Sequence, residues 1–73
     1  MKELVIEDLL YFSVYGLRQI CSHNRDILNS FNTLSRIQLI ELIQTRLKEN
    51  RRILIPPFVY TDNKYLLSQY KVM

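Results

Sequence analysis

The sequence predicts one small, mainly α domain made of three short helices, followed by an extended or hairpin C-terminal tail. Apolar residues recur at helical spacing in three segments, about 3–12, 13–22 and 36–49, and each later segment begins at or just after a serine. A length of 73 residues, 48% hydrophobic and 23% charged, is typical of a single globular domain with a small core. We therefore divide the chain into a helical domain, residues 1–50, and an extension, residues 51–73, that packs on this domain or on a partner.

The helices have recognisable boundaries. Ser13 and Ser35 are good N-cap residues, because a serine hydroxyl can accept a hydrogen bond from an unpaired N–H group of the first turn. Asn50 should end the last helix. Gly16, inside the second helix, costs about 1 kcal/mol relative to alanine and permits close packing of another helix. At 100° steps four apolar residues of the last helix share one arc, and we expect this helix to be largely buried: Leu39, Ile40, Ile43 and Leu47.

The remaining segments are less regular. Residues 23–34 have the composition of a loop, and their apolar side chains should hold that loop against the core. Residues 53–60, Ile-Leu-Ile-Pro-Pro-Phe-Val-Tyr, must be extended at the two prolines, because proline disfavours helical conformation in the residue before it. Residues 65–72 are compatible with a one-sided helix or with a strand that pairs back on residues 58–60, and we favour a hairpin or an extended tail.

Composition excludes several function classes. One cysteine leaves no disulfide within the chain, and together with one histidine it cannot form a four-ligand zinc site. A single glycine and the lack of a triad candidate argue against catalysis, so we expect no enzyme, cofactor or metal. The longest apolar run, residues 9–12, is far shorter than the roughly 20 residues of a membrane span. We therefore expect a complete, soluble, cytoplasmic protein in a reducing compartment.

Two stretches of the chain carry a shared motif pattern. Residues 8–20 contain Asp-Leu-Leu and then Ser-Val-x-x-Leu-Arg-x-Ile, and residues 34–43 read Leu-Ser-Arg-Ile-Gln-Leu-Ile-Glu-Leu-Ile. The pattern resembles the Rho-termination-factor N-terminal domain and its SAP relatives, which are helix–extended loop–helix domains, over residues of about 7–47. The resemblance implies binding of DNA, as in SAP modules, or of RNA or single strands, as in Rho-like ones. Matched by position, Arg18 and Arg36 are the family's basic residues.

The charge distribution supplies candidate contacts for nucleic acid. The net charge is +3, and residues 1–10 hold one cation and three acids, so the basic excess lies in residues 11–73. The stretch from Arg46 to Arg52 is the densest, and it either follows a phosphate backbone or complements the helix dipole. With about four phosphate contacts, the log–log salt slope on duplex would be roughly −3.6. The candidate residues are Arg18, Arg25, Arg36, Arg46, Lys48, Arg51 and Arg52.

Aromatic and apolar residues support a second hypothesis, that of a protein-interaction subunit of a larger assembly. The apolar tail could add as a strand to a protein partner or to a second copy of the chain. Near the first helix junction, Tyr11, Phe12 and Tyr15 either stack on bases or belong to the core, and we favour the core. The candidate protein contacts in the tail are Ile53, Ile55, Phe58, Tyr60 and Tyr65.

Overall fold

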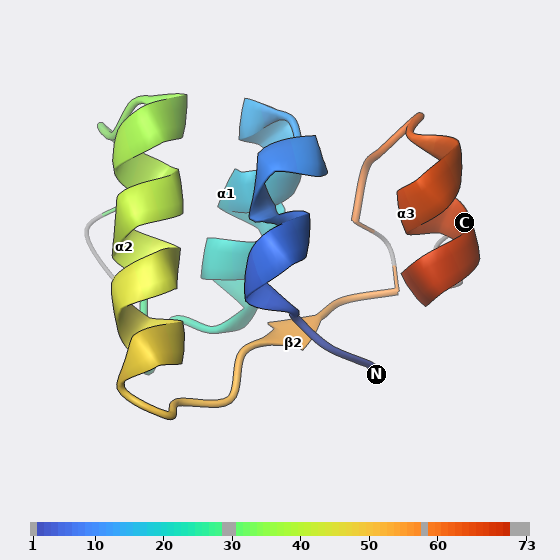
Figure 1. Ribbon diagram of the computed structural model, residues 1–73. Coiled ribbons are helices and arrows are strands. Elements are labelled where there is room, and N and C mark those ends of the chain that lie inside the picture. The colour runs from blue at the N-terminus through green and yellow to red at the C-terminus, as the bar shows by residue number, and fades with distance from the viewer. Residues whose placement is uncertain (1, 29–30, 58, 71–73) are drawn as a thin grey trace.

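The computed structural model confirms the mainly α fold class, and it describes residues 2–28, 31–57 and 59–70. Helices α1 and α2 lie side by side and run in the same direction, with the loop crossing between them, while α3 lies on the far side of α1 from α2 (Figure 1). In chain order the elements are strand β1 (Lys2–Glu3), the 3₁₀ helix η1 (Ile6–Tyr11), α1 (Val14–His23), α2 (Arg36–Lys48), strand β2 (Leu54–Ile55) and α3 (Lys64–Tyr70).

The serine caps predicted for α1 and α2 are confirmed. The Ser13 hydroxyl accepts a hydrogen bond from the Gly16 N–H group at 3.3 Å. Ser35 and Gln38 form a reciprocal capping box, in which each side chain accepts from the other residue's backbone N–H group. Asn50 follows α2 with φ of +62°, the left-handed conformation that commonly ends helices and that asparagine tolerates.

The first helix differs from its prediction, because the chain is extended before it. Lys2 pairs with Ile55 and Glu3 with Leu54 in an antiparallel two-stranded sheet. The Leu4 N–H group continues this pairing by donating to the Ile53 carbonyl at 2.7 Å. Backbone groups that are hydrogen-bonded to β2 cannot also form the hydrogen bonds of a helix. In place of the predicted helix over 3–12, the structure has the six-residue 3₁₀ helix η1.

The C-terminal segment is a helix, so the hairpin prediction is wrong over residues 64–70. The Asn63 side chain accepts a hydrogen bond from the Leu66 N–H group at 3.1 Å and thereby caps the first turn. Leu66 and Tyr70, four residues apart, fall on the buried side of α3. Residues 71 and 72, the end of the predicted hairpin, lie outside the described residues.

One apolar core collects side chains from the helices, the loop and the C-terminal extension. Leu28 and Phe31 are buried in it, which confirms that the loop is held against the core. The prediction of a largely buried α2 is wrong, since only Leu39 and Ile43 are buried there while Ile37 is 67% exposed. The reason is that α2 packs against α1 and η1, which both lie on one side of it.

Gly16 does permit a close approach, but its neighbour is a segment outside any helix, residues 59 and 60, rather than another helix. A Cβ atom at this position would lie 2.9 Å from the Tyr60 carbonyl oxygen and 3.2 Å from a ring carbon of Phe12. Real Cβ atoms do not approach backbone oxygens this closely, so the absence of a side chain lets residues 59 and 60 lie directly on α1.

Candidate nucleic-acid interface

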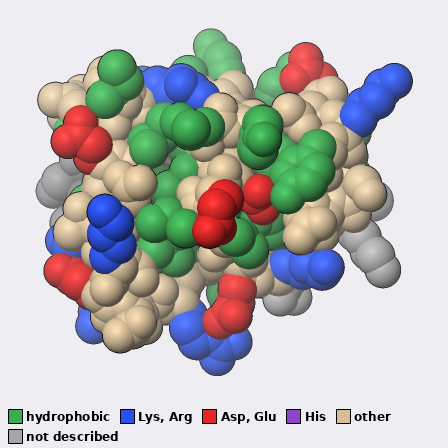
Figure 2. All heavy atoms as spheres, viewed as in Figure 1, with side chains coloured by type: hydrophobic (Ala, Val, Ile, Leu, Met, Phe, Trp, Pro, Cys, Tyr) green, Lys and Arg blue, Asp and Glu red, His purple; other side chains and the backbone are tan. Residues whose placement is uncertain are grey.

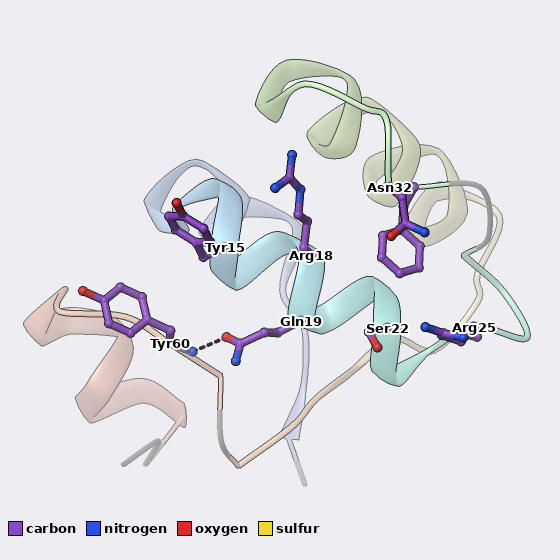
Figure 3. A pocket seen from close by; sticks show the side chains of 8 residues that line it. Tyr15, Arg18, Gln19, Ser22, Arg25, Asn32 and Tyr60 are labelled. Atoms are coloured by element: carbon purple, nitrogen blue, oxygen red, sulfur yellow. Dashed lines mark hydrogen bonds between the residues drawn. The ribbon is translucent and has the colours of Figure 1, made fainter.

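A groove of about 710 Å³ runs along the exposed face of α1, between the loop that precedes α2 and the segment that precedes α3 (Figure 3). We call it the α1 groove. Its volume lies in the range of sites that hold small ligands or single nucleotides. The residues that line it are Tyr15, Arg18, Gln19, Ser22, Arg25, Phe31, Asn32 and Tyr60.

Helical spacing explains how α1 supplies the floor of the groove. Tyr15, Arg18 and Ser22 lie at positions i, i+3 and i+7, which share one face of a helix. The opposite face carries the buried residues Leu17, Ile20 and Cys21 in the core. Because the apolar face is held by the core, the polar stripe is fixed toward solvent.

The charged groups of the groove are both cationic. Among the described residues, Arg18 and Arg25 are its charged lining residues, and no described carboxylate lines it. Within the described part of the chain, the Arg18 guanidinium has no hydrogen-bond or ion-pair partner, and Figure 3 shows it extending away from α1. The Arg25 guanidinium lies 6.0 Å from the centre of the Phe31 ring, a cation–π contact. The groove is therefore suited to an anion.

Two exposed aromatic rings lie at one end of the groove, on the same side of the arginines (Figure 3). Tyr15 is 66% exposed and Tyr60 is 57% exposed, so both present ring surface to solvent. The core interpretation holds for Phe12, which is 1% exposed, but is wrong for Tyr15 and for Tyr11. The physical reason is the break between η1, which ends at Tyr11, and α1, which begins at Val14: the residues between them are extended, so neighbouring aromatic residues face different surroundings.

The position of Tyr60 is fixed by its backbone. Its N–H group donates a hydrogen bond to the Gln19 side-chain oxygen on α1 (Figure 3). Its carbonyl oxygen lies against Gly16, and the preceding Val59 is fully buried in the core. The Tyr60 ring therefore stands in the groove wall on an anchored backbone.

Two of the other predicted arginines bond to the protein itself. The Arg36 guanidinium donates to the Phe12 carbonyl at 3.1 Å and to the Leu10 carbonyl at 2.7 Å, which ties the start of α2 to the end of η1. The Arg46 guanidinium donates to the Ile27 carbonyl at 3.4 Å and lies 3.3 Å from the Glu49 carboxylate. These donors hold the fold together and are less available to a ligand.

The seven predicted basic residues therefore do not form one surface. Arg52 pairs with the Glu3 carboxylate, while Lys48 and Arg51 are exposed near the end of α2 and do not line the groove. On the face drawn in Figure 2, basic side chains stand apart from one another, with hydrophobic and acidic side chains between them. The groove brings together only Arg18 and Arg25 of the set.

The predicted protein contacts are also divided. Ile53 and Ile55 are 0% and 2% exposed in the chain's own core, so the prediction that they contact a partner is wrong. Tyr60 and Tyr65 are exposed, whereas Phe58 lies outside the described residues. The Tyr65 hydroxyl donates to the buried Asp8 carboxylate at 3.0 Å, so this hydroxyl already has a hydrogen-bond partner within the chain.

The sequence interpretation missed the uncharged half of the groove: Gln19, Ser22, Phe31 and Asn32. Part of it was detectable, because Tyr15, Gln19 and Ser22 form a polar stripe opposite the apolar face of α1. Phe31 and Asn32 carry no such signal, since the path of the loop places them there.

Other chemistry is not supported by the described residues, in which no three His, Cys, Asp or Glu side chains are grouped to hold a metal ion. Burial raises the pKa of the Cys21 thiol to about 11, which disfavours the reactive thiolate. Within the described ranges, no helix has the length and apolar character needed to cross a membrane. Comparison with protein-family models, curated proteins and solved structures finds no match.

Proposed function

We propose that this protein is a small, non-enzymatic nucleic-acid-binding accessory protein that contacts phosphates through the α1 groove. The observation that carries the proposal is the pair Arg18 and Arg25 in a groove whose described lining residues include no carboxylate. Arginine donors facing an open, acid-free groove are a common way to hold phosphate groups. The proposal places this activity in the cytoplasm.

The resemblance stated for the sequence supports the same function. The order of elements that it implies, two helices joined by a loop, is compatible with α1 and α2, which follow one another in the chain. Arg18, one of the two basic residues matched by position, lines the groove. Arg36, the other, uses two of its donors on backbone carbonyls, so we assign it a supporting structural role.

The small number of free cations in the groove changes the expected salt dependence. Two phosphate contacts, by Arg18 and Arg25, give a log–log slope of about −1.4 on a single strand and about −1.8 on duplex. The duplex slope is half as steep as the slope of roughly −3.6 expected from four contacts.

Fluorescence anisotropy with labelled single-stranded DNA, single-stranded RNA and duplex DNA at low salt tests the proposal. Arg18→Ala and Arg25→Ala should each weaken binding about tenfold, which corresponds to about 1.4 kcal/mol. Lys48→Ala and Arg51→Ala are matched controls, because they remove an exposed cation outside the groove and should change affinity less than about threefold. Failure of all three nucleic acids to bind would refute the function.

The alternative function, a protein-interaction subunit, is favoured by a different observation. Leu10 and Ile37 are 69% and 67% exposed, and neither lines the α1 groove. A partner or a second copy of the chain would cover such side chains. Sedimentation velocity tests whether these side chains form an interface between two copies of the chain. A dimer that Leu10→Ser or Ile37→Ser dissociates would support the interaction function, and a monomer at high concentration would count against self-association.

A further inference from the structure

We infer that the α1 groove takes an unpaired strand, with nucleobases stacked on the Tyr15 and Tyr60 rings and phosphates held by Arg18 and Arg25. This inference rests on the proposed function and specifies its ligand. The observation behind it is that two rings, 66% and 57% exposed, line the same groove as the two arginines.

The rings discriminate between paired and unpaired nucleic acid. In a duplex the faces of the bases are stacked on one another, so a duplex could reach the arginines through its phosphates but would leave both rings without a partner. An unpaired strand has free base faces, and stacking on an aromatic side chain is available to every base. An unpaired strand can therefore contact both Tyr15 and Arg18, whereas a duplex can contact only Arg18.

The groove places its rings and its cations at successive points along α1 (Figure 3). Arg18 lies on α1, whereas Arg25 lies in the turn just beyond the end of that helix, so the two guanidinium groups stand at different points along the groove (Figure 3). Tyr15 lies one turn before Arg18 on α1, and Tyr60 forms the opposite wall (Figure 3). A strand passing along α1 would therefore meet the two tyrosine rings at one end of the groove and the two arginines farther along it, a set of contacts that a single anion such as free phosphate would not use.

Several of these groups are held in place before any ligand arrives. The Tyr60 backbone is anchored by Gln19 and by contact with Gly16, and the Arg25 guanidinium lies over the Phe31 ring. Binding a strand then orders few additional side chains, which reduces the entropy lost on association. Because stacking and phosphate contacts both depend little on base identity, sequence preference should be weak.

The test compares four probes with the wild-type protein: single-stranded DNA, single-stranded RNA, duplex DNA and an abasic DNA strand that keeps phosphates but lacks bases. Either intact single strand should bind about tenfold more tightly than the duplex or the abasic strand. Tyr15→Leu and Tyr60→Leu should each weaken strand binding about tenfold, and should not change the weaker binding of the abasic strand. Tyr11→Leu is the matched control, since Tyr11 is 52% exposed but lies outside the groove.

The results distinguish a failure of the unpaired-strand inference from a failure of the proposed nucleic-acid-binding function. If the duplex and the abasic strand bind as tightly as the intact strands, while Arg18→Ala still weakens them all, the unpaired-strand inference is overturned and phosphate binding stands. If none of the probes binds, both fail. The comparison of probes uses the wild-type chain, so it does not depend on the folding of any variant.

Discussion

The side-chain amide of Asn24 pairs with both backbone groups of Leu54. Its Nδ2 atom donates to the Leu54 carbonyl at 3.0 Å, and its Oδ1 atom accepts from the Leu54 N–H group at 3.1 Å. The same Nδ2 atom also donates to the Ile20 carbonyl at 2.7 Å. A side chain that is 5% exposed thus joins the end of α1 to β2, on the edge that β1 leaves free.

Asn24→Ala should therefore reduce the free energy of unfolding by roughly 2–3 kcal/mol, because the Leu54 groups lose their partners in a partly buried place. Urea denaturation monitored by circular dichroism measures this loss. Asn32→Ala is the matched control, an exposed asparagine whose removal should cost less than about 0.5 kcal/mol. Equal effects at the two positions would contradict the role given to Asn24.

The buried carboxylate of Asp8 holds α3 through two tyrosines. The Tyr70 hydroxyl donates to it at 2.5 Å and also accepts from the Val5 N–H group at 3.2 Å, while the Tyr65 hydroxyl donates at 3.0 Å. Tyr70 is 7% exposed and Tyr65 is 49% exposed. Tyr70→Phe should cost roughly 1–3 kcal/mol in urea denaturation, and Tyr65→Phe distinctly less, since water can replace the exposed hydroxyl. The reverse order would contradict this account.

Alkaline pH should destabilise the fold. Burial raises the pKa of Cys21 from 9.0 to about 11, and burial together with the hydrogen bond to Asp8 raises the pKa of Tyr70 above its ordinary value of 10. Both groups therefore lose their protons at a lower pH in the unfolded chain than in the folded one. The free energy of unfolding falls as pH rises above about 9. The slope approaches about 1.4 kcal/mol per pH unit for each group.

Urea denaturation at pH 8, 9.5 and 11 measures this dependence. Tyr70→Phe removes one of the two groups, and the variant should lose less stability than the wild type between pH 9.5 and 11. A loss of the same size in both proteins would show that Tyr70 does not contribute to it.

Gly16→Ala should destabilise the protein, although alanine is the better helix former by about 1 kcal/mol. The added methyl group would lie 2.9 Å from the Tyr60 carbonyl oxygen, and a backbone atom cannot move aside without displacing the 59–60 segment. Ser22→Ala provides the comparison within the same helix, at an exposed position where alanine should be neutral or slightly stabilising. A Gly16→Ala variant with a raised thermal midpoint would contradict the close approach.

The parts of the fold that local chemistry determines could be predicted from the sequence. The serine caps, the end of α2 at Asn50 and the anchoring of the loop by Leu28 and Phe31 depend on near neighbours and on side-chain hydrophobicity. The predictions failed where distant segments compete for the same backbone groups. Residues 2–4 would suit a helix, but their pairing with residues 53–55 is a long-range choice that no local pattern reveals.

The candidate site shows the same division. Arg18 and Arg25 could be selected by charge and by the family resemblance, but their separation from Arg36, Arg46 and Arg52 could not. Those three guanidinium groups are directed toward carbonyls or carboxylates that come close only after folding. The exposure of Tyr15 likewise depends on the extended break between η1 and α1.

The most direct test of the α1 groove as a nucleic-acid site is a ¹H–¹⁵N correlation NMR titration of the labelled protein with a short single-stranded oligonucleotide. The account predicts that shifted amides concentrate at Tyr15, Arg18, Ser22, Asn32 and Tyr60, with small changes at residues 46–52. Shifts concentrated at residues 46–52, with the groove amides unchanged, or no shifts at all, would contradict it.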